Sequence, residues 1–293
     1  MHETGGFYYM NSSTVPALRS QFRRLRRMYF IFLLLAVAAL VCYFLEPRLT
    51  LVILGLSLGL NLVVGRRASR SYKENFTRAA ALVTLEKHLD APYWRDGVTL
   101  TETEVRDARM IPTNAGSGGT VCHQGGGGSY RGCQVLVEDV TIAHSFTENG
   151  KKRHNFTVGS WVRVDLGRDT GLDCRFLGEG ILSAQSLKEM LWVETDLRSQ
   201  TPPAPLDPGW RVLTTESNPA LPETPVLRQI ERLRRDTDSQ IALAIEGQYL
   251  HCLLVGRLIA QTVSSRQAPG EGFEKADLLQ ELSQVLNLCD RLK

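Results

Sequence analysis

The sequence lacks the short motifs that mark several common classes of enzyme and metal protein. It has no His-Glu-x-x-His zinc motif and no paired-glycine dinucleotide motif, and the run of four glycines at residues 125–128 is followed by no lysine that would complete a phosphate loop. Its 6 cysteines form no pairs at the close spacing of structural zinc sites. Because no catalytic motif is present, we expect no enzyme activity and no cofactor.

Most of the chain also lacks an excess of positive charge. Residues 77–293 carry 24 Lys and Arg against 28 Asp and Glu, a net charge of −4, whereas residues 1–76 carry 10 against 3, a net charge of +7. Binding to nucleic acid requires a basic surface that neutralises phosphates. The acidic main part therefore argues against nucleic acid as a partner, and the basic first part needs another explanation.

Two long apolar runs within the first 76 residues supply that explanation. Residues 28–45 contain no charged side chain, and 18 residues are close to the minimum for crossing a hydrocarbon core about 30 Å thick. A second run, residues 49–65, follows after only three residues. So short a connection predicts a transmembrane helical hairpin over residues 28–65, with the lipid bilayer as a partner. A signal peptide followed by a buried helix is one alternative, but no convincing cleavage site follows Leu45. A re-entrant hairpin is another, because the second run is short and contains Asn61, and its two ends would lie on the same side of the membrane.

Basic side chains flank both ends of the predicted hairpin. They are Arg23, Arg24, Arg26 and Arg27 in the basic N-terminal segment, residues 1–27, and Arg66, Arg67, Arg70 and Lys73 after the second run. The positive-inside rule places both flanks in the cytoplasm. We therefore predict a multi-pass protein of the cytoplasmic membrane with cytoplasmic N- and C-termini, and we interpret these eight side chains as candidates for contact with the anionic membrane surface.

A juxtamembrane helix is expected after the hairpin, over residues 66–92. Apolar residues recur there at helical spacing, and Asp90, Ala91 and Pro92 are typical of a helix end. A short helix opened by Thr101 or Thr103 should follow, since acidic residues occupy its first turn.

The last part of the chain, residues 93–293, predicts a cytoplasmic α+β domain. Alternating Val, Ile, Phe and Thr predict strand hairpins over residues 133–167 and 239–256, with further strands and helices between them. Residues 273–293 carry an apolar stripe typical of an amphipathic helix. Hairpins combined with helices favour an antiparallel sheet closed by a C-terminal helix.

The segment of residues 122–133, which begins and ends with cysteine, contains the four glycines. Cys122, His123 and Cys133 are candidate metal ligands or redox-active thiols, although adjacent side chains cannot easily face one ion and no second ligand pair exists. A disulfide is disfavoured in the reducing cytoplasm. Four glycines in a row specify little structure, so we interpret the segment as a mobile loop that leads into the first core strand.

The order of these features resembles a bacterial membrane protein family known as domain of unknown function 3137. Tyr130, Arg131 and Gly132 are similar to its "Tyr-Val-x-Gly" motif. The resemblance extends to Phe156, Gly159, Trp161 and Asp165, which are similar to its "Phe-x-Gly-x-Phe-x-x-x-Asp" strands, and to the helix, hairpin and Phe273–Glu274 pair near the end. It covers residues 15–293 and implies the architecture described above. It brings no activity, cofactor or site residue with it.

Three functional hypotheses follow from the sequence. The leading one is a non-enzymatic two-span membrane protein whose cytoplasmic domain contacts a protein partner or the membrane surface. The second is a membrane-tethered enzyme without a recognisable motif, and the third is a metal or redox sensor that uses Cys122, His123 and Cys133.

Overall fold

The structure is a computed structural model of the 293-residue chain. It describes residues 7–8, 14–45, 47–95, 99–111, 119–148, 151–182, 184–194, 196–237, 239–260, 269 and 278–293. The chain divides into two units. The helical unit includes residues 10–83, and the sheet unit includes residues 1–9, 84–260 and 277–293.

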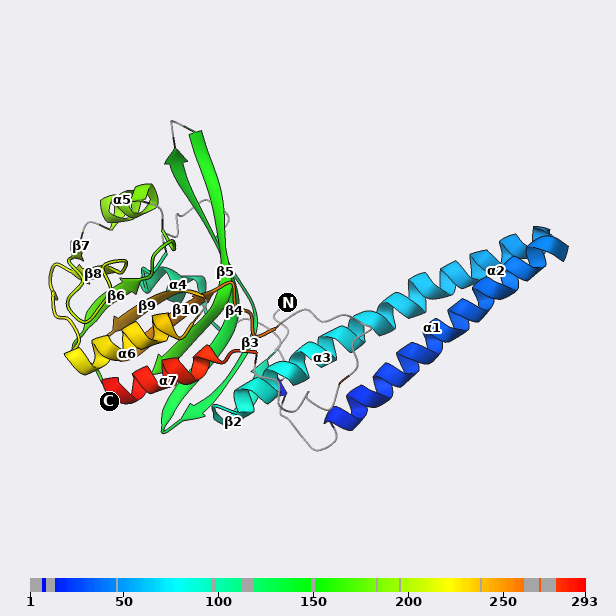
Figure 1. Ribbon diagram of the computed structural model, residues 1–293, viewed down its shortest axis with the longest axis horizontal. Helices are drawn as coiled ribbons and strands as arrows, with labels where there is room; N and C mark the ends of the chain where they lie inside the picture. Colours follow the sequence, from blue (N-terminus) through cyan, green and yellow to red (C-terminus); the bar gives the residue numbers. More distant parts are fainter. Residues whose placement is uncertain are drawn as a thin grey trace. The chain divides into compact units, whose positions relative to one another are not determined.

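The helical unit is built from two long helices (Figure 1). Helix α1 (Thr14–Leu45) joins the basic N-terminal segment to the first apolar run without a break. The second is continuous through α2 (Pro47–Leu60), the π-helical turn η1 (Asn61–Gly65) and α3 (Arg66–Glu86). The Thr50 hydroxyl donates to the Ala39 carbonyl at 3.3 Å and the Asn75 amide donates to Gln21 at 3.2 Å, so the two helices run antiparallel.

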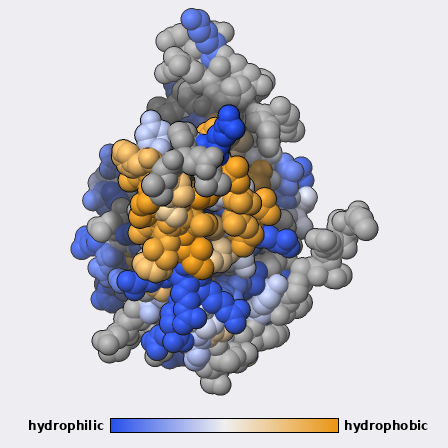
Figure 2. Space-filling view, turned by 90° about the vertical axis from the view of Figure 1, so that its right-hand side faces the viewer, coloured by the Kyte–Doolittle hydropathy of each residue, from blue (hydrophilic) through white to orange (hydrophobic). Residues whose placement is uncertain are grey.

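Both long helices have the length and composition needed to cross a membrane. Among the described residues, all but three of the exposed large apolar side chains lie between Tyr29 and Val64. Figure 2 shows an apolar patch on the face of the hairpin turned toward the viewer. The sequence expectation of two apolar helices in a hairpin is therefore confirmed.

The sheet unit contains one antiparallel sheet in the order β1-β2-β3-β4-β5-β10-β9-β6-β8-β7. The two-residue β1 (Phe7–Tyr8) lies at one edge. The other strands are β2 (Asp90–Arg95), β3 (Thr120–Tyr130), β4 (Cys133–Glu148), β5 (Lys151–Asp165), β6 (Asp173–Leu177), β7 (Leu197–Gln200), β8 (Arg211–Thr215), β9 (Gln240–Glu246) and β10 (Tyr249–Val255).

Helices cover both faces of this sheet. On one face, α6 (Thr224–Arg235) and α7 (Glu281–Leu292) lie side by side (Figure 1). On the other, α4 (Glu102–Asp107) and α5 (Ala184–Val193) contribute Val105 and Met190 to a core with Leu136 and Ala244 of the sheet. Strands buried on both faces have apolar side chains at nearly every position, as in β9 and β10. The α+β prediction and its C-terminal helix are confirmed.

Local signals in the sequence set several element boundaries. Thr101 is the N-cap of α4, where its hydroxyl accepts from the Glu104 amide and the Glu104 carboxylate accepts from the Thr101 amide. The juxtamembrane helix is present, but it ends earlier than expected. Helix α3 ends at Glu86, and Asp90, Ala91 and Pro92 belong to β2, where Ala91 has a φ of 47°. The Phe273–Glu274 pair lies outside the described residues.

The glycine run is a buried strand, so the interpretation as a mobile loop was wrong. All four glycines lie in β3 between β2 and β4. A Cβ on Gly126 would lie 2.8 Å from Leu85 Cδ1 and would also meet the Tyr93 carbonyl, and one on Gly125 would lie 2.8 Å from Glu138 Cα. The glycines are therefore needed because neighbouring main chains approach where a side chain would stand.

The strand turns back at Arg131 and Gly132. Their φ angles of 47° and 82° are those of a two-residue hairpin turn, which joins Tyr130 to its partner Cys133. Of the residues similar to the "Tyr-Val-x-Gly" motif, Tyr130 thus ends β3, and Arg131 and Gly132 form the β3–β4 turn.

Strands β4 and β5 extend beyond their neighbours as a two-stranded ribbon (Figure 1). Strand β3 ends opposite Ile142 and β10 ends opposite Gly159, whereas β4 and β5 stay paired to Glu148 and Lys151. Both edges of the ribbon lack a neighbouring strand among the described residues.

Replacing Gly126 by alanine should destabilise the sheet unit, because the new methyl group must displace the main chain of β2. Overpacking of this kind costs about 1–3 kcal/mol, which corresponds to a fall of about 5 °C in the melting temperature. Circular dichroism of the full chain in detergent measures the shift. Gln124→Ala in the same strand is the control and should shift the temperature by less than about 2 °C. Equal melting temperatures for the two variants would show that β3 accommodates a side chain at Gly126.

Candidate functional site at the base of the helical hairpin

The eight basic side chains predicted to contact a membrane surface lie on two neighbouring helices of the helical unit. We call this set the basic collar: Arg23, Arg24, Arg26 and Arg27 on α1, and Arg66, Arg67, Arg70 and Lys73 on α3. The ring centroids of Phe22 and Tyr72 are 5.7 Å apart, which places the two groups at the same level of the hairpin. The structure thus brings together two groups of residues that 38 intervening residues separate in sequence.

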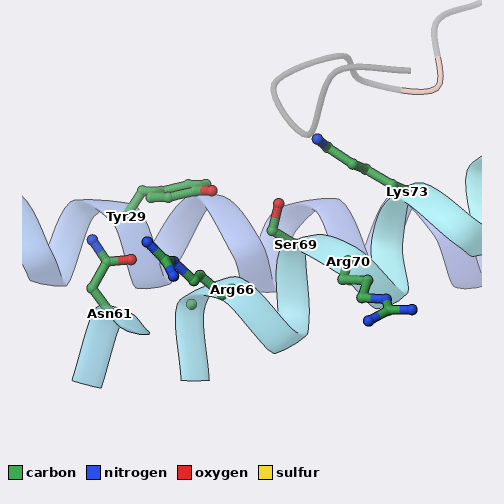
Figure 3. A pocket seen from close by; sticks show the side chains of 7 residues that line it. Tyr29, Asn61, Arg66, Ser69, Arg70 and Lys73 are labelled. Atoms are coloured by element: carbon green, nitrogen blue, oxygen red, sulfur yellow. The ribbon is translucent and has the colours of Figure 1, made fainter. Parts of the chain in front are cut away.

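A pocket of about 280 Å³ lies in the collar (Figure 3). It is lined by Tyr29 of α1, Asn61 and Gly65 of η1, and Arg66, Ser69, Arg70 and Lys73 of α3. The four α3 residues follow the spacing of one helix face. In Figure 3, Asn61 and Arg66 point toward Tyr29, whereas Arg70 points away from it.

The π-helical turn explains how Asn61 joins this face. The Arg66 amide donates to the Asn61 carbonyl, so the hydrogen-bonded ring spans five residues in place of the usual four. Residues joined by this hydrogen bond lie on the same side of the helix, one turn apart. The Asn61 side chain therefore lies on the same helix face as Arg66. Turns of this kind occur often at functional sites.

Gly65 forms the inner wall of the pocket. It is buried, and a Cβ at this position would lie 2.6 Å from Asn61 Oδ1 and 3.2 Å from Phe32 Cε2 of α1. The missing side chain therefore leaves the space that the Asn61 amide occupies and lets α1 approach closely.

Within the described part of the helical unit, little negative charge accompanies the positive charge of the collar. Glu74 is the only carboxylate in the described part of this unit, and its Oε1 accepts from Arg70 Nε at 2.9 Å. Arg66 and Lys73 form no ion pair with any described residue. A second hollow, of about 460 Å³, is lined by Arg23, Arg26 and Arg27 together with Phe30 and Ile31. Guanidinium and ammonium groups beside hydroxyl and amide donors form a surface suited to anionic oxygens.

The cysteines and histidine singled out in the sequence are not brought together. Cys122 pairs with Val140 near one end of the β3–β4 ladder, and Cys133 pairs with Tyr130 at the other end. His123 contacts the Thr141 hydroxyl at 2.9 Å. Among the described residues, no three His, Cys, Asp or Glu side chains are grouped to hold a metal ion.

Cys133 instead faces the C-terminal helix. Its sulfur lies 3.5 Å from that of Cys289, and both are buried. Burial raises the pKa of Cys289 to about 12, and burial likewise raises the pKa of Cys122 to about 12. Thiols with such pKa values are protonated at neutral pH, so they are poor nucleophiles and poor metal ligands.

Buried charges in the sheet unit fasten loops to the sheet. Glu138 accepts from the Leu100 amide at 2.8 Å, and Asp139 accepts from the Ser160 hydroxyl at 2.7 Å and the Ala260 amide at 2.8 Å. Burial raises the pKa of both carboxyls, while these hydrogen bonds oppose the rise. Each carboxylate is therefore occupied by a structural partner.

Two further buried polar groups have similar structural roles. Arg175 donates to the Ala108 carbonyl at 3.2 Å and pairs with Asp173. His251 accepts from Trp161 Nε1 at 3.2 Å, and burial lowers its pKa to about 3, so it stays neutral. A neutral histidine fixed by a tryptophan is typical of a core contact.

Comparison of the chain with protein-family models, with curated proteins and with solved structures finds no match in any of the three. The resemblance to domain of unknown function 3137 stays a prediction. The basic collar was identified from the sequence, but the pocket within it was not. The one available signal was an asparagine in an apolar run followed by a glycine, Asn61 and Gly65.

Proposed function

We propose that this chain is a two-span protein of the cytoplasmic membrane whose sheet unit is a non-enzymatic, cytoplasmic interaction domain. The observation that carries the proposal is the apolar surface of the hairpin between Tyr29 and Val64. Covering a large apolar side chain gains about 1.5–3 kcal/mol, so leaving this surface in water would cost tens of kcal/mol. A bilayer covers such a surface on all sides.

The basic collar supports the proposed orientation. It flanks the apolar surface on both helices, and each Lys or Arg near an anionic leaflet gains about 1 kcal/mol. Arg48, in the first turn of α2, is the only basic residue that the structure describes between the two apolar runs. The positive-inside rule then favours a cytoplasmic collar and cytoplasmic termini.

The surface of the ribbon supports the interaction role. In the described part of the sheet unit, the exposed large apolar side chains are Val121, Phe156 and Val158, which expose 49%, 64% and 37% of their area. Val121 and Val158 are the direct partners of Thr141 on either side, and Phe156 is two positions from Val158. They share one sheet face, next to strand edges that another chain can extend.

A reporter measures the proposed topology. Green fluorescent protein fused after Lys293 should fluoresce, and alkaline phosphatase fused there should be inactive, because the C-terminus is cytoplasmic. Alkaline phosphatase inserted after Arg48 should be active, and the unfused chain should remain in the membrane pellet after carbonate extraction. Phosphatase activity after Lys293 would refute the orientation, and release by carbonate would refute the membrane span.

Photo-crosslinking in intact cells tests the interaction role. A photoreactive amino acid at Phe156 of the ribbon or at Val121 of β3 beside it should form a discrete protein adduct, because both side chains are exposed. The matched control is Ser217, an exposed residue elsewhere in the sheet unit, which should give none. If the label at Phe156 forms adducts only with lipid, the proposed protein partner is refuted in favour of the membrane surface. Identical products from the label at Ser217 would contradict a specific contact.

A further inference from the structure

We infer that the pocket at the π-helical turn is a binding site for the phosphate of an anionic phospholipid. The inference rests on the proposed membrane insertion and goes beyond it, because a collar that attracts a leaflet by charge alone needs no pocket. Three features carry it: the donors that line the pocket, the positive charge that no carboxylate among the described residues balances, and the apolar surface beside the pocket.

The first feature is the set of donors. Arg66 offers a planar fork of N–H groups, Lys73 an ammonium, Tyr29 and Ser69 hydroxyls, and Asn61 an amide. Arginine binds phosphate oxygens through two parallel hydrogen bonds, and hydroxyl and amide groups supply further single bonds. These donors come from both helices, so a bound phosphate would join α1 to α3.

The second feature is charge. Arg70 is paired to Glu74 at 2.9 Å and points away from Tyr29 in Figure 3, but Arg66 and Lys73 have no counter-charge among the described residues. Lys73 is half-buried, which removes part of its hydration. An anion in the pocket would restore this balance, so the ligand should carry at least one negative charge.

The third feature selects a lipid over a free phosphate. The exposed side chains of Phe30, Leu62 and Val63 belong to the apolar surface of the hairpin and are sequence neighbours of the pocket residues Tyr29, Asn61 and Gly65. A headgroup phosphate held by Arg66 would leave its acyl chains along that surface. The volume of about 280 Å³ lies just below the roughly 300–1,000 Å³ of sites that enclose a drug-sized molecule. The pocket therefore suits a headgroup whose tails remain outside.

The π-helical turn is the reason that the pocket forms at this position along the helix. Without it, Asn61 would fall on another face of the helix, away from Arg66. Gly65 leaves the room that Asn61 occupies, so both residues shape the pocket without contributing charge.

Binding can be measured with the full chain in neutral detergent by native mass spectrometry. The probes are dioctanoyl phosphatidylglycerol, dioctanoyl phosphatidylcholine and inorganic phosphate. We expect phosphatidylglycerol to bind about tenfold more tightly than phosphatidylcholine. Inorganic phosphate should compete only weakly, because it gains nothing from the apolar surface. Competition by phosphate at equal concentration would overturn the lipid assignment in favour of a soluble phosphate site.

Matched double variants separate the pocket from the collar. Arg66→Gln with Lys73→Gln removes two charges that line the pocket and should weaken phosphatidylglycerol binding about tenfold. Arg24→Gln with Arg67→Gln removes two collar charges that do not line it and should weaken binding less than about twofold. Equal losses in the two variants would overturn the inference, since a diffuse basic surface would then suffice.

A smaller substitution tests the pocket with less risk that the variant fails to fold. Membrane insertion is measured in a separate experiment. Tyr29→Phe removes one hydroxyl and should weaken phosphatidylglycerol binding about threefold, with phosphatidylcholine unchanged. Unchanged binding of both lipids in this variant would count against the pocket geometry. Carbonate extraction should leave all variants in the membrane. Release of the wild-type chain would refute the proposed span, whereas retention with unselective lipid binding would refute the pocket alone.

Discussion

The apolar surface of the helical hairpin is the constraint on which the functional interpretation depends. Large aliphatic and aromatic side chains surround the hairpin from Tyr29 to Val64. Among the side chains that the structure describes in the two apolar runs, only those of Ala39 and Thr50 are buried before Gly65. Helices that expose apolar side chains on all sides need an apolar environment on all sides. The basic collar is placed where that surface ends, and the pocket lies at the border.

The two units differ in how they arrange charged and apolar side chains. In the helical unit, charge and apolar surface are separated along the helix axis, as expected for a chain at a lipid–water border. In the sheet unit, both faces of one antiparallel sheet are covered by helices, and buried carboxylates such as Asp139 hold the connecting segments. The ribbon of β4 and β5 is the part of that sheet left without strand neighbours.

The sequence predicted the elements whose signals are local. The hairpins of β4–β5 and β9–β10 follow from alternation, and the final helix follows from helical spacing. Capping signals left Thr101 and Thr103 as candidates for the N-cap of α4, and Thr101 is the one that the structure uses. Residues 125–128 were misassigned because glycine has a low strand propensity, and its use here depends on how closely β2 and β4 approach. The pocket could not be predicted because it depends on a π-helical turn and on the packing of Phe32 against Gly65. Neither the π-helical turn nor the contact between the two helices produces a periodic pattern in the sequence.

The central claim is that the hairpin lies in a bilayer with its collar at the aqueous surface. Nitroxide labels at Leu40, Leu58 and Ser71, in a Cys42→Ser chain whose other native thiols are buried, report this directly in reconstituted vesicles. Oxygen concentrates in the hydrocarbon core, and a nickel chelate stays in water. A membrane-spanning hairpin predicts greater oxygen accessibility at Leu40 and Leu58 and greater nickel accessibility at Ser71. Dominant nickel accessibility at all three positions would contradict it.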